Sequence, residues 1–516
     1  MNLRGFIYSF FVVVALMAMS SCSKIPKSVK MLNDDAAILV RIDVKQLAEK
    51  AGLSKEKGAV EGWLSKLSPE AQKKIKEILD KPVKLGLDLR DPLFFSANEK
   101  GDYRLVGTVY DDDNFRDFLN AVSKDAGFEK VKEKDGLQMV DIKGTLLAFD
   151  GDCFLITKSD ADVKAIFKSD SKLTDDEDFV KMCDRESDIQ MLIKGEPLSR
   201  KNHLDGELAD MMEDMSYLTD VVFDKGELVA TTENLFKSDK AKKIYDKYTA
   251  LMGDIKGDFA NYFSKNGMAF FGNIKGEKLY ELLDKMGYLD MAKKFGGMPE
   301  SELADMLKSI NGDVAFGLNS FNNPARGNAG GSGSLYVSMA SDKLLRLLSG
   351  ALRWKEVTPG TYQLNMGGMD VILGYKNGAM FALGSSEKND SVSVEPFANV
   401  PNALTKSDIL AKGKGLYFFM NMRMFDVSSD AKEILKDLDK FEMYTDKDRK
   451  FILRLSMTDK ERNAVVPFTK FLYRYFSMVK TRSDEIKATY SAIQEADLDE
   501  EAAKERELRA LEEMMD

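Results

Sequence analysis

The sequence predicts an α+β protein built from two similar halves, in which helices pack on one face of mostly antiparallel sheets. Alternating apolar and polar segments are separated by tight turns such as Asp135-Gly136 and Asn377-Gly378, which is typical of hairpins. Apolar positions at helical spacing lie between these strands. Several strand and helix blocks also occur twice in the same order. An acidic helix is expected to complete the C-terminus.

The first two dozen residues have the three parts of an export signal. Arg4 precedes an apolar run from Phe6 to Met19, and two serines follow before Cys22. This ending resembles the lipobox of bacterial lipoproteins, in which the cysteine receives a diacylglycerol and becomes the first mature residue. The resemblance implies that Cys22 is the lipid attachment site. An uncleaved transmembrane helix is the alternative, but the run is shorter than the roughly 20 residues that a span needs.

The chain is expected to divide into five segments. These are a signal peptide (1–21), a lipidated tether (22–33), a first α+β repeat (34–255), a second α+β repeat (256–480) and an acidic helical tail (481–516). The tether has no acidic cluster of the kind that would resemble the surface-export signal of Bacteroidetes lipoproteins. We therefore expect an outer-membrane lipoprotein on the periplasmic side rather than on the cell surface.

Composition limits the classes of partner. The apolar fraction of 44% and the charged fraction of 31% are those of a globular protein that can bury a core. A net charge of −10 argues against nucleic acid as a partner and against a basic surface that binds anionic lipid. The predicted attachment to the membrane is through the lipid alone.

The duplication is predicted from five blocks that recur in order. Residues 105–122 match residues 335–352, and the shared acidic turn and following apolar position are both 230 positions apart. The other paired segments are 37–44 with 268–274, 128–131 with 354–357, 151–156 with 378–383, and 189–193 with 416–420. Each half then ends in a hairpin and a helix. Whether the halves share one sheet cannot be read from this pattern.

Two segments depart from the repeat. Residues 320–334 are rich in glycine, asparagine and serine, which predicts an expanded hairpin loop. From about Asp484 the chain turns acidic, with apolar residues at helical spacing, and residues 497–516 carry nine acidic and three basic side chains. A solvated terminal helix and a helix that binds a partner are both compatible with this pattern.

Recognisable catalytic chemistry is missing from the sequence, so we predict no catalytic, cofactor-binding or metal-binding residues. The one histidine, His203, lies in a polar stretch expected to be an exposed loop. The densest carboxylate sets, Asp111–Asp113 and Asp175–Asp178, precede predicted helices, where carboxylates usually cap free N–H groups. Asp342 is expected to do the same in the second half. A hydrolase using two carboxylates stays open, because their separation cannot be read from sequence.

Cysteine, aromatic and methionine side chains are expected to serve packing. Cys153 and Cys183 remain after lipidation, and pairing between them is left open. Some aromatic residues could instead line a sugar- or peptide-binding cleft. They are Trp63, Trp354, Tyr417, Phe418 and Phe419. The paired methionines Met211-Met212 and Met514-Met515 are likewise expected to fill space.

The opening of the mature chain is similar to a known family. Ile25-Pro26-Lys27, the strand-like run from Ala36 to Asp43, and Leu47 resemble large Bacteroidetes lipoproteins classed as a domain of unknown function (DUF4836-like). The resemblance covers nearly the whole mature chain and implies a cell-envelope lipoprotein. It supplies no activity, ligand or catalytic residue.

These observations favour a lipid-anchored envelope protein that is not an enzyme and that binds an unknown protein or glycan partner. Two alternatives stay open. One is a polysaccharide hydrolase that works through carboxylates. The other is a structural or assembly protein that acts through its C-terminal helix.

Overall fold

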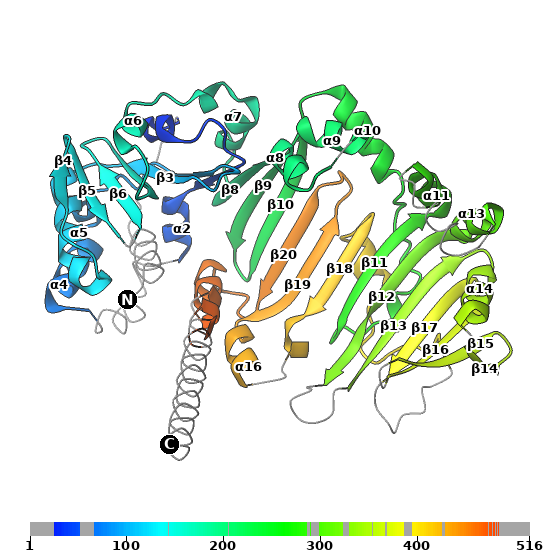
Figure 1. Ribbon diagram of the computed structural model, residues 1–516. Coiled ribbons are helices and arrows are strands. Elements are labelled where there is room, and N and C mark those ends of the chain that lie inside the picture. Colours follow the sequence, from blue (N-terminus) through cyan, green and yellow to red (C-terminus); the bar gives the residue numbers. More distant parts are fainter. Residues whose placement is uncertain are drawn as a thin grey trace, which may run out of the picture.

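A computed structural model describes most of the chain between residues 25 and 483. The described residues are 25–51, 67–142, 144–204, 206–285, 289, 299–322, 330–352, 354–366, 369–385, 395–425, 429–472, 474–476, 478, 479, 481 and 483. They form one large sheet of 20 strands with helices packed against it (Figure 1). Every strand pair is antiparallel, so the predicted α+β class and antiparallel sheet are confirmed.

The first ten strands lie side by side in the order β4-β5-β6-β7-β3-β2-β1-β8-β9-β10. Their bounds are β1 Ile38–Ile42, β2 Leu93–Ala97, β3 Tyr103–Thr108, β4 Lys132–Lys134, β5 Leu137–Asp141, β6 Thr145–Phe149, β7 Cys153–Lys158, β8 Ile189–Lys194, β9 Met215–Asp224 and β10 Glu227–Phe236.

The last ten strands have the same order, β14-β15-β16-β17-β13-β12-β11-β18-β19-β20. Their bounds are β11 Met268–Lys275, β12 Ile310–Asn322, β13 Gly330–Met339, β14 Lys355–Thr358, β15 Thr361–Met366, β16 Met369–Lys376, β17 Ala379–Ser385, β18 Leu416–Asn421, β19 Leu438–Thr445 and β20 Phe451–Met457. Each strand of the first half therefore has a counterpart ten strands later.

The pairing register repeats as well. Val40 in β1 lies opposite Phe95 and Met191, and Phe270 in β11 lies opposite Phe316 and Phe418. Four of the five paired segments fall on these equivalent strands, whereas residues 128–131 end before β4 and residues 354–357 overlap β14. The register and strand order of the second half therefore reproduce those of the first.

The two halves share one sheet because their last strands pair. β10 and β20 lie antiparallel over six residue pairs, from Glu227 opposite Ser456 to Thr232 opposite Phe451. Side chains from both halves also form one buried group at this seam, including Phe223, Leu455 and Met457. Figure 1 shows the sheet running without a break from β8–β10 to β18–β20.

The helices complete the element list. The α-helices are α2 Val44–Ala51, α4 Pro69–Asp80, α5 Asp112–Ala126, α6 Val163–Phe167, α7 Glu177–Cys183, α8 Gly195–Lys201, α9 Gly206–Glu213, α10 Asp239–Thr249, α11 Gly276–Lys285, α13 Glu300–Ser309, α14 Lys343–Leu352, α15 Lys406–Leu410 and α16 Ser429–Leu435. The 3₁₀ helices are η1 Lys27–Met31, η2 Pro82–Leu85, η3 Lys172–Asp175, η4 Ala260–Tyr262 and η6 Met422–Phe425. A further helix begins at residue 465.

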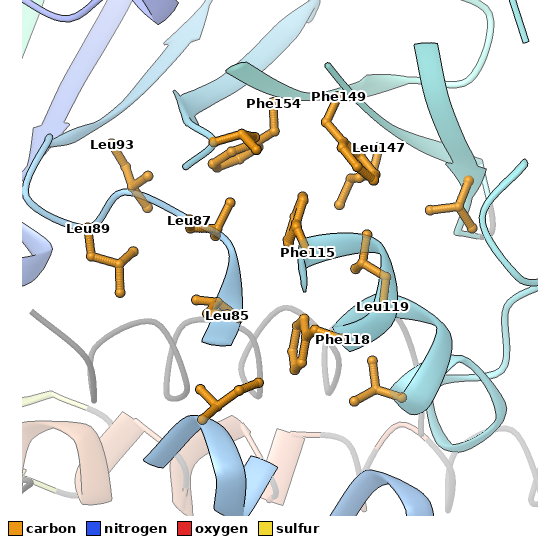
Figure 2. Packing of buried hydrophobic residues seen from close by; sticks show 14 of the residues in the cluster. Leu85, Leu87, Leu89, Leu93, Phe115, Phe118, Leu119, Leu147, Phe149 and Phe154 are labelled. Atoms are coloured by element: carbon orange, nitrogen blue, oxygen red, sulfur yellow. The ribbon is translucent and has the colours of Figure 1, made fainter. Parts of the chain in front are cut away.

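The longer helices of the first half cover part of one face of its sheet, which we call the helical face. α5 begins after Asp111, whose carboxylate accepts the Asn114 N–H, and ends at Gly127, whose φ of 74° suits glycine. Three of its buried side chains are Phe115, Phe118 and Leu119. They pack against the leucines between η2 and β2, which are Leu85, Leu87, Leu89 and Leu93 (Figure 2). α2 and α4 contribute to the same group of buried residues.

The opposite face of the sheet is covered by short helices and irregular segments. In the first half, η1, α6 and α7 supply Val29, Val163 and Phe179 to a second core. In the second half, the segments around η4 and α15 bury Phe263 and Ile409 against the sheet. The prediction that helices pack on one face holds for the longer helices, whereas short helices also cover the other face.

The predicted hairpin around residues 320–334 is confirmed, but its strands extend into the segment that was expected to be loop. β12 continues to Asn322 and β13 begins at Gly330, so that only residues 323–329 lie outside the described residues. Gly333 is paired with Leu318 on one side and Gly384 on the other. Because two neighbouring strands satisfy its backbone hydrogen bonds, this segment is strand despite its low strand propensity.

Candidate functional site: an open apolar face in the second half

A row of apolar side chains crosses the helical face of the second half. Residues directly opposite each other in adjacent antiparallel strands point to the same face. Each member of the row is the register partner of the next: Leu453, Met443, Phe418, Phe270, Phe316 and Leu335. The row therefore runs perpendicular to β20, β19, β18, β11, β12 and β13.

A second row flanks the first. Phe441, Met420, Met268 and Leu318 are also register partners on this face. We call these ten side chains the apolar floor. Phe316 is 46% exposed, and the other nine are partly exposed. The floor is rich in phenylalanine and methionine, side chains that are usually buried.

Aromatic contacts tie the floor together. The rings of Phe270 and Phe316 stack with centroids 4.9 Å apart, and Phe418 meets Phe441 edge-on at 6.0 Å. The rings therefore form an ordered surface. A contiguous exposed apolar surface of this kind is typical of an interaction site.

Two of the strands that carry the floor are longer than their counterparts in the first half. β12 has 13 residues and β13 has ten, whereas their counterparts β2 and β3 have five and six. α11, α13 and α14 lie along one end of these strands (Figure 1). In the first half, Val40, Phe95 and Met191 occupy the corresponding register positions and are also partly exposed, whereas Leu93 and Phe154 on the same face are buried.

Helices border the floor on two sides. On one side, Val465, Phe468 and Phe471 of the helix that follows β20 pack in the group that also contains Phe441 and Leu453. On the other side, Leu345 of α14 is buried among residues that include Val337 and Met339 and that contact Leu335. The uncovered strip between them therefore interrupts a layer of helices.

A polar hollow lies at one end of the floor. It is lined by Asn266, Asn421, Arg423, Met424 and Asp439, from the start of β11, the end of β18, η6 and the start of β19. Arg423 is exposed, and its guanidinium forms no ion pair with any residue that the structure describes. Asp439 is already paired with Lys460 at 2.9 Å. An unpaired cation therefore stands beside the apolar surface.

The opposite face of β18 and β19 holds a buried carboxylate. Glu442 is 1% exposed and accepts hydrogen bonds from Lys412 at 2.7 Å and from the Tyr417 hydroxyl at 2.9 Å, while Lys440 lies 3.0 Å away. Burial alone would raise the pKa of Glu442, but the two ammonium groups outweigh it and hold that pKa below its ordinary value. With its oxygens occupied in this way, Glu442 is suited to stability rather than to proton transfer.

Another charged group lines a shallow hollow beside α7. Arg185 bonds both Asp220 and Glu233, and Lys181 also bonds Glu233. The hollow itself is lined by Thr174, Asp175, Glu177, Val180, Lys181, Asp184 and Arg185. Because Arg185 and Lys181 are paired within the protein, we assign this group to the junction of α7 with the sheet.

The predicted site residues are not brought together. Cys22, the predicted lipid attachment site, lies outside the described residues. His203 is exposed after α8, as expected for a loop histidine. Asp111 and Asp176 cap α5 and α7 through their side chains, which confirms their predicted role. Asp342 is paired with Arg346 at 2.7 Å.

Other predicted residues serve packing. Met211 and Met212 are buried among α8, α9 and α10, and Tyr417 and Phe419 are buried in the second-half core. Trp354 packs partly buried near α14. Trp63 and Met514-Met515 lie outside the described residues.

The structure shows whether Cys153 and Cys183 form a disulfide. Cys153 and Cys183 are both free. Burial raises the pKa of the Cys153 thiol to about 11 and that of Cys183 to about 12. Neither thiol is therefore poised for reaction.

The described part of the chain shows neither a cluster of metal ligands nor a membrane-spanning helix. Among the described residues, no group of three or more His, Cys, Asp or Glu side chains is arranged to hold a metal ion. Within that same part of the chain, none of the helices combines the length and the apolar character needed to cross a membrane.

Sequence reasoning missed the apolar floor, although a signal was present. The runs Met268 to Phe271 and Leu416 to Met420 are apolar at consecutive positions. Such runs are typical of strands with two apolar faces. We interpreted Phe418 as core, whereas it lies on the partly open face and its neighbour Phe419 is buried.

The fold and the floor define a class: a large antiparallel α+β protein with an open apolar strip. The chain belongs to the family described as Domain of unknown function (DUF4836), which matches residues 29–458. The suspected family resemblance is thereby confirmed. No curated protein matches.

Solved structures offer only distant likeness. Crystal form III of TP0453 has a TM-score of 0.25 and 12% identity, covering 45% of this chain and 90% of that chain. Crystal form IV of TP0453 has a TM-score of 0.25 and 11% identity, covering 40% of this chain and 80% of that chain. This likeness is too weak to support any conclusion about the chain.

Proposed function

We propose that this protein is a lipid-anchored envelope protein that acts as a non-catalytic binding module through its apolar floor. The lipid on Cys22 would hold it on the periplasmic side of the outer membrane. Each buried methylene of an acyl chain contributes about 0.8 kcal/mol, so two or more chains anchor a protein firmly. The anchor leaves the folded body free to meet a partner in the aqueous space.

One observation carries this proposal: Phe316 is 46% exposed at the centre of an ordered aromatic and methionine surface. Covering an exposed apolar surface gains roughly 25 cal/mol for each Å² removed from water. A partner that presents an apolar segment would therefore gain affinity here. The chemistry of the floor favours a protein segment with an apolar side as the partner.

We further propose that the two halves arose by duplication of one folding unit. The repeated strand order, the repeated register and the matching sequence blocks support this origin. At the position of Phe316, which is 46% exposed, the first copy has Phe95, which is partly exposed. Divergence after duplication would thus have left the second copy with the more exposed side chain at this position.

Site-specific photocrosslinking in cells tests the binding role. A photoreactive amino acid in place of Phe316 should give covalent adducts with a protein. The matched control is the same substitution at Val83, which is 63% exposed in η2 of the first half and lies away from the floor. Adducts at both positions, or at neither, would count against the floor as the binding surface.

Metabolic labelling tests the anchor. Labelled palmitate should be incorporated into the wild-type chain and into a Cys153→Ser, Cys183→Ser variant, but not into Cys22→Ser. Labelling that survives the loss of Cys22 would exclude it as the lipid site.

A further inference from the structure

The C-terminal segment of the chain offers an occupant for the apolar floor. The helix that begins at residue 465 starts on the helical face. There the ring centroids of Phe468 and Phe223 lie 5.7 Å apart. It thus forms one border of the floor. Residues 484–516 follow this helix and lie outside the described residues.

The described helix does not turn toward its own floor. Val465, Phe468 and Phe471 pack against the sheet, but Tyr475 is 43% exposed and Phe476 is 37% exposed. Arg474 bonds Asp437 and the Glu433 carbonyl, which fixes this part of the helix beside α16. Figure 1 shows the helix, coloured orange to red beyond β20, directed away from the strands.

The sequence beyond this point gives no signal for a reversal. The chain contains no glycine after Gly415 and no proline after Pro467, and these are the residues that most often end or bend a helix. As one helix, residues 484–516 would extend about 50 Å at 1.5 Å per residue. If the tail continued in the direction of the described helix, it would not reach the floor of its own chain.

The tail has the composition that the floor and its polar end would accept. Ile486, Tyr490 and Ile493 recur at helical spacing, as do Leu508, Leu511 and Met515. Acidic residues surround the second set, with nine carboxylates among residues 497–516. Arg423, whose guanidinium has no ion-pair partner among the described residues, lies at the end of the floor and could receive one of them.

We infer that the floor receives the C-terminal helix of a second copy of this chain, so that two copies exchange their tails. The inference rests on the proposed function, because it names the partner of the same surface. The tail helix of each copy would fill the strip between α14 and the helix that borders the floor. A symmetric pair of such contacts closes on itself as a dimer.

Mass measurement and disulfide trapping test this exchange. The full mature chain carrying Cys22→Ser, so that it cannot be acylated, should have the mass of a dimer in light scattering. Phe316→Asp should yield a monomer, while Val83→Asp should remain a dimer. Far-ultraviolet circular dichroism of Phe316→Asp separates loss of the contact from loss of the fold. A monomeric parent chain would overturn the inference.

Trapping identifies which tail occupies the floor. The starting chain lacks the natural thiols through Cys22→Ser, Cys153→Ser and Cys183→Ser. One preparation then carries Phe316→Cys and another carries Leu511→Cys, and oxidation of their mixture should link two chains. A further preparation carries both cysteines. If it forms links only within one chain, undiminished by excess cysteine-free protein, the tail covers its own floor and the inference is wrong.

The photocrosslinking and mass measurements distinguish failure of the tail exchange from failure of the proposed binding role. If the photoreactive residue at position 316 captures a different protein and never a second copy, the binding role stands and the exchange is refuted. If it captures nothing in cells and the chain is monomeric, both are refuted. Capture of a second copy that is lost when the chain is shortened to residue 483 supports both.

Discussion

Phe270 and Phe316 stack on the open face of the sheet, with ring centroids 4.9 Å apart and planes inclined by 26°. The next residue in β11, Phe271, points to the other face and meets Phe263 edge-on at 5.3 Å in the sealed core. Two neighbouring phenylalanines of one strand thus have opposite surroundings. The difference between them separates a partly open apolar face from a folding core.

Phe271→Ala should destabilise the protein far more than Phe316→Ala. Phe271 is fully buried, and removal of a buried phenylalanine costs roughly 3–5 kcal/mol because a cavity remains. Phe316→Ala forfeits mainly the ring pair, about 1 kcal/mol. Urea unfolding of the two variants measures this difference. Equal losses would mean that Phe316 is sealed in the folded protein.

Lys50→Met should destabilise the protein strongly through Asp188. The Asp188 carboxylate is completely buried, and it accepts hydrogen bonds from Lys50 at 2.7 Å and from the Phe223 backbone N–H at 2.7 Å. Removing the ammonium leaves a buried charge without compensation, which costs roughly 3–5 kcal/mol. Denaturant unfolding at neutral pH measures the loss.

Lys45→Met is the matched control, since it changes a lysine in the same helix. Lys45 lies 3.9 Å from Glu49, whose side chain is largely exposed. Such surface pairs contribute about 0.5 kcal/mol or less. If the Lys50 variant were as stable as the Lys45 variant, the ion pair between Lys50 and Asp188 would not contribute to stability.

Glu442 should make stability depend on pH in the acid range. Burial opposes its charge, yet Lys412 and Lys440 hold the pKa of Glu442 below its ordinary value of 4.5. A carboxyl group with a lowered folded pKa stabilises the fold above its unfolded pKa, and the contribution fades as pH falls through the folded pKa. Glu442→Gln should therefore lie furthest below wild type near pH 7.

The stability gap between wild type and Glu442→Gln should narrow as pH falls below about 4.5. Thermal unfolding across a pH series from neutral to acid would reveal this convergence. Glu433→Gln serves as a control because Glu433 is exposed beside Lys436. A gap that stayed constant with pH would show that the Glu442 charge does not contribute.

Sequence patterns predicted the class and the repeated order well because both depend on local alternation and spacing. The blocks at residues 105–122 and 335–352 fall on β3–α5 and β13–α14. Carboxylates before helices were also predictable, since Asp111 and Asp176 act on N–H groups two or three residues away. Capping interactions join residues that are close in the sequence, so the local sequence predicts them.

The shared sheet and the open floor could not be predicted because they depend on distant pairing. Residue 230 lies opposite residue 453, and nothing near either position specifies the other. Residues 332–334 were predicted as loop, yet they pair with β12 on one side and β17 on the other. Exposure of Phe316 depends on how far α11, α13 and α14 extend over the strands, which is a property of packing.

The seam between the halves should make them unfold together. Met457 is fully buried in a group that takes Phe223 and Leu228 from the first half and Leu438 from the second. Met457→Ala should cost roughly 2–5 kcal/mol. Because the seam strands β10 and β20 share backbone hydrogen bonds, the variant should lose amide protection in β9 and β10 as well as in β19 and β20.

Hydrogen exchange followed by mass spectrometry measures this protection strand by strand. Ile75→Ala provides a comparison, since Ile75 is equally buried but lies in α4, within the core of the first half. Its effect should be largest in α4, α5 and β2. If Met457→Ala loosened only strands after residue 267, the halves would be separate folding units that merely touch. Loss of protection on both sides of the seam requires that β10 and β20 hold one continuous sheet.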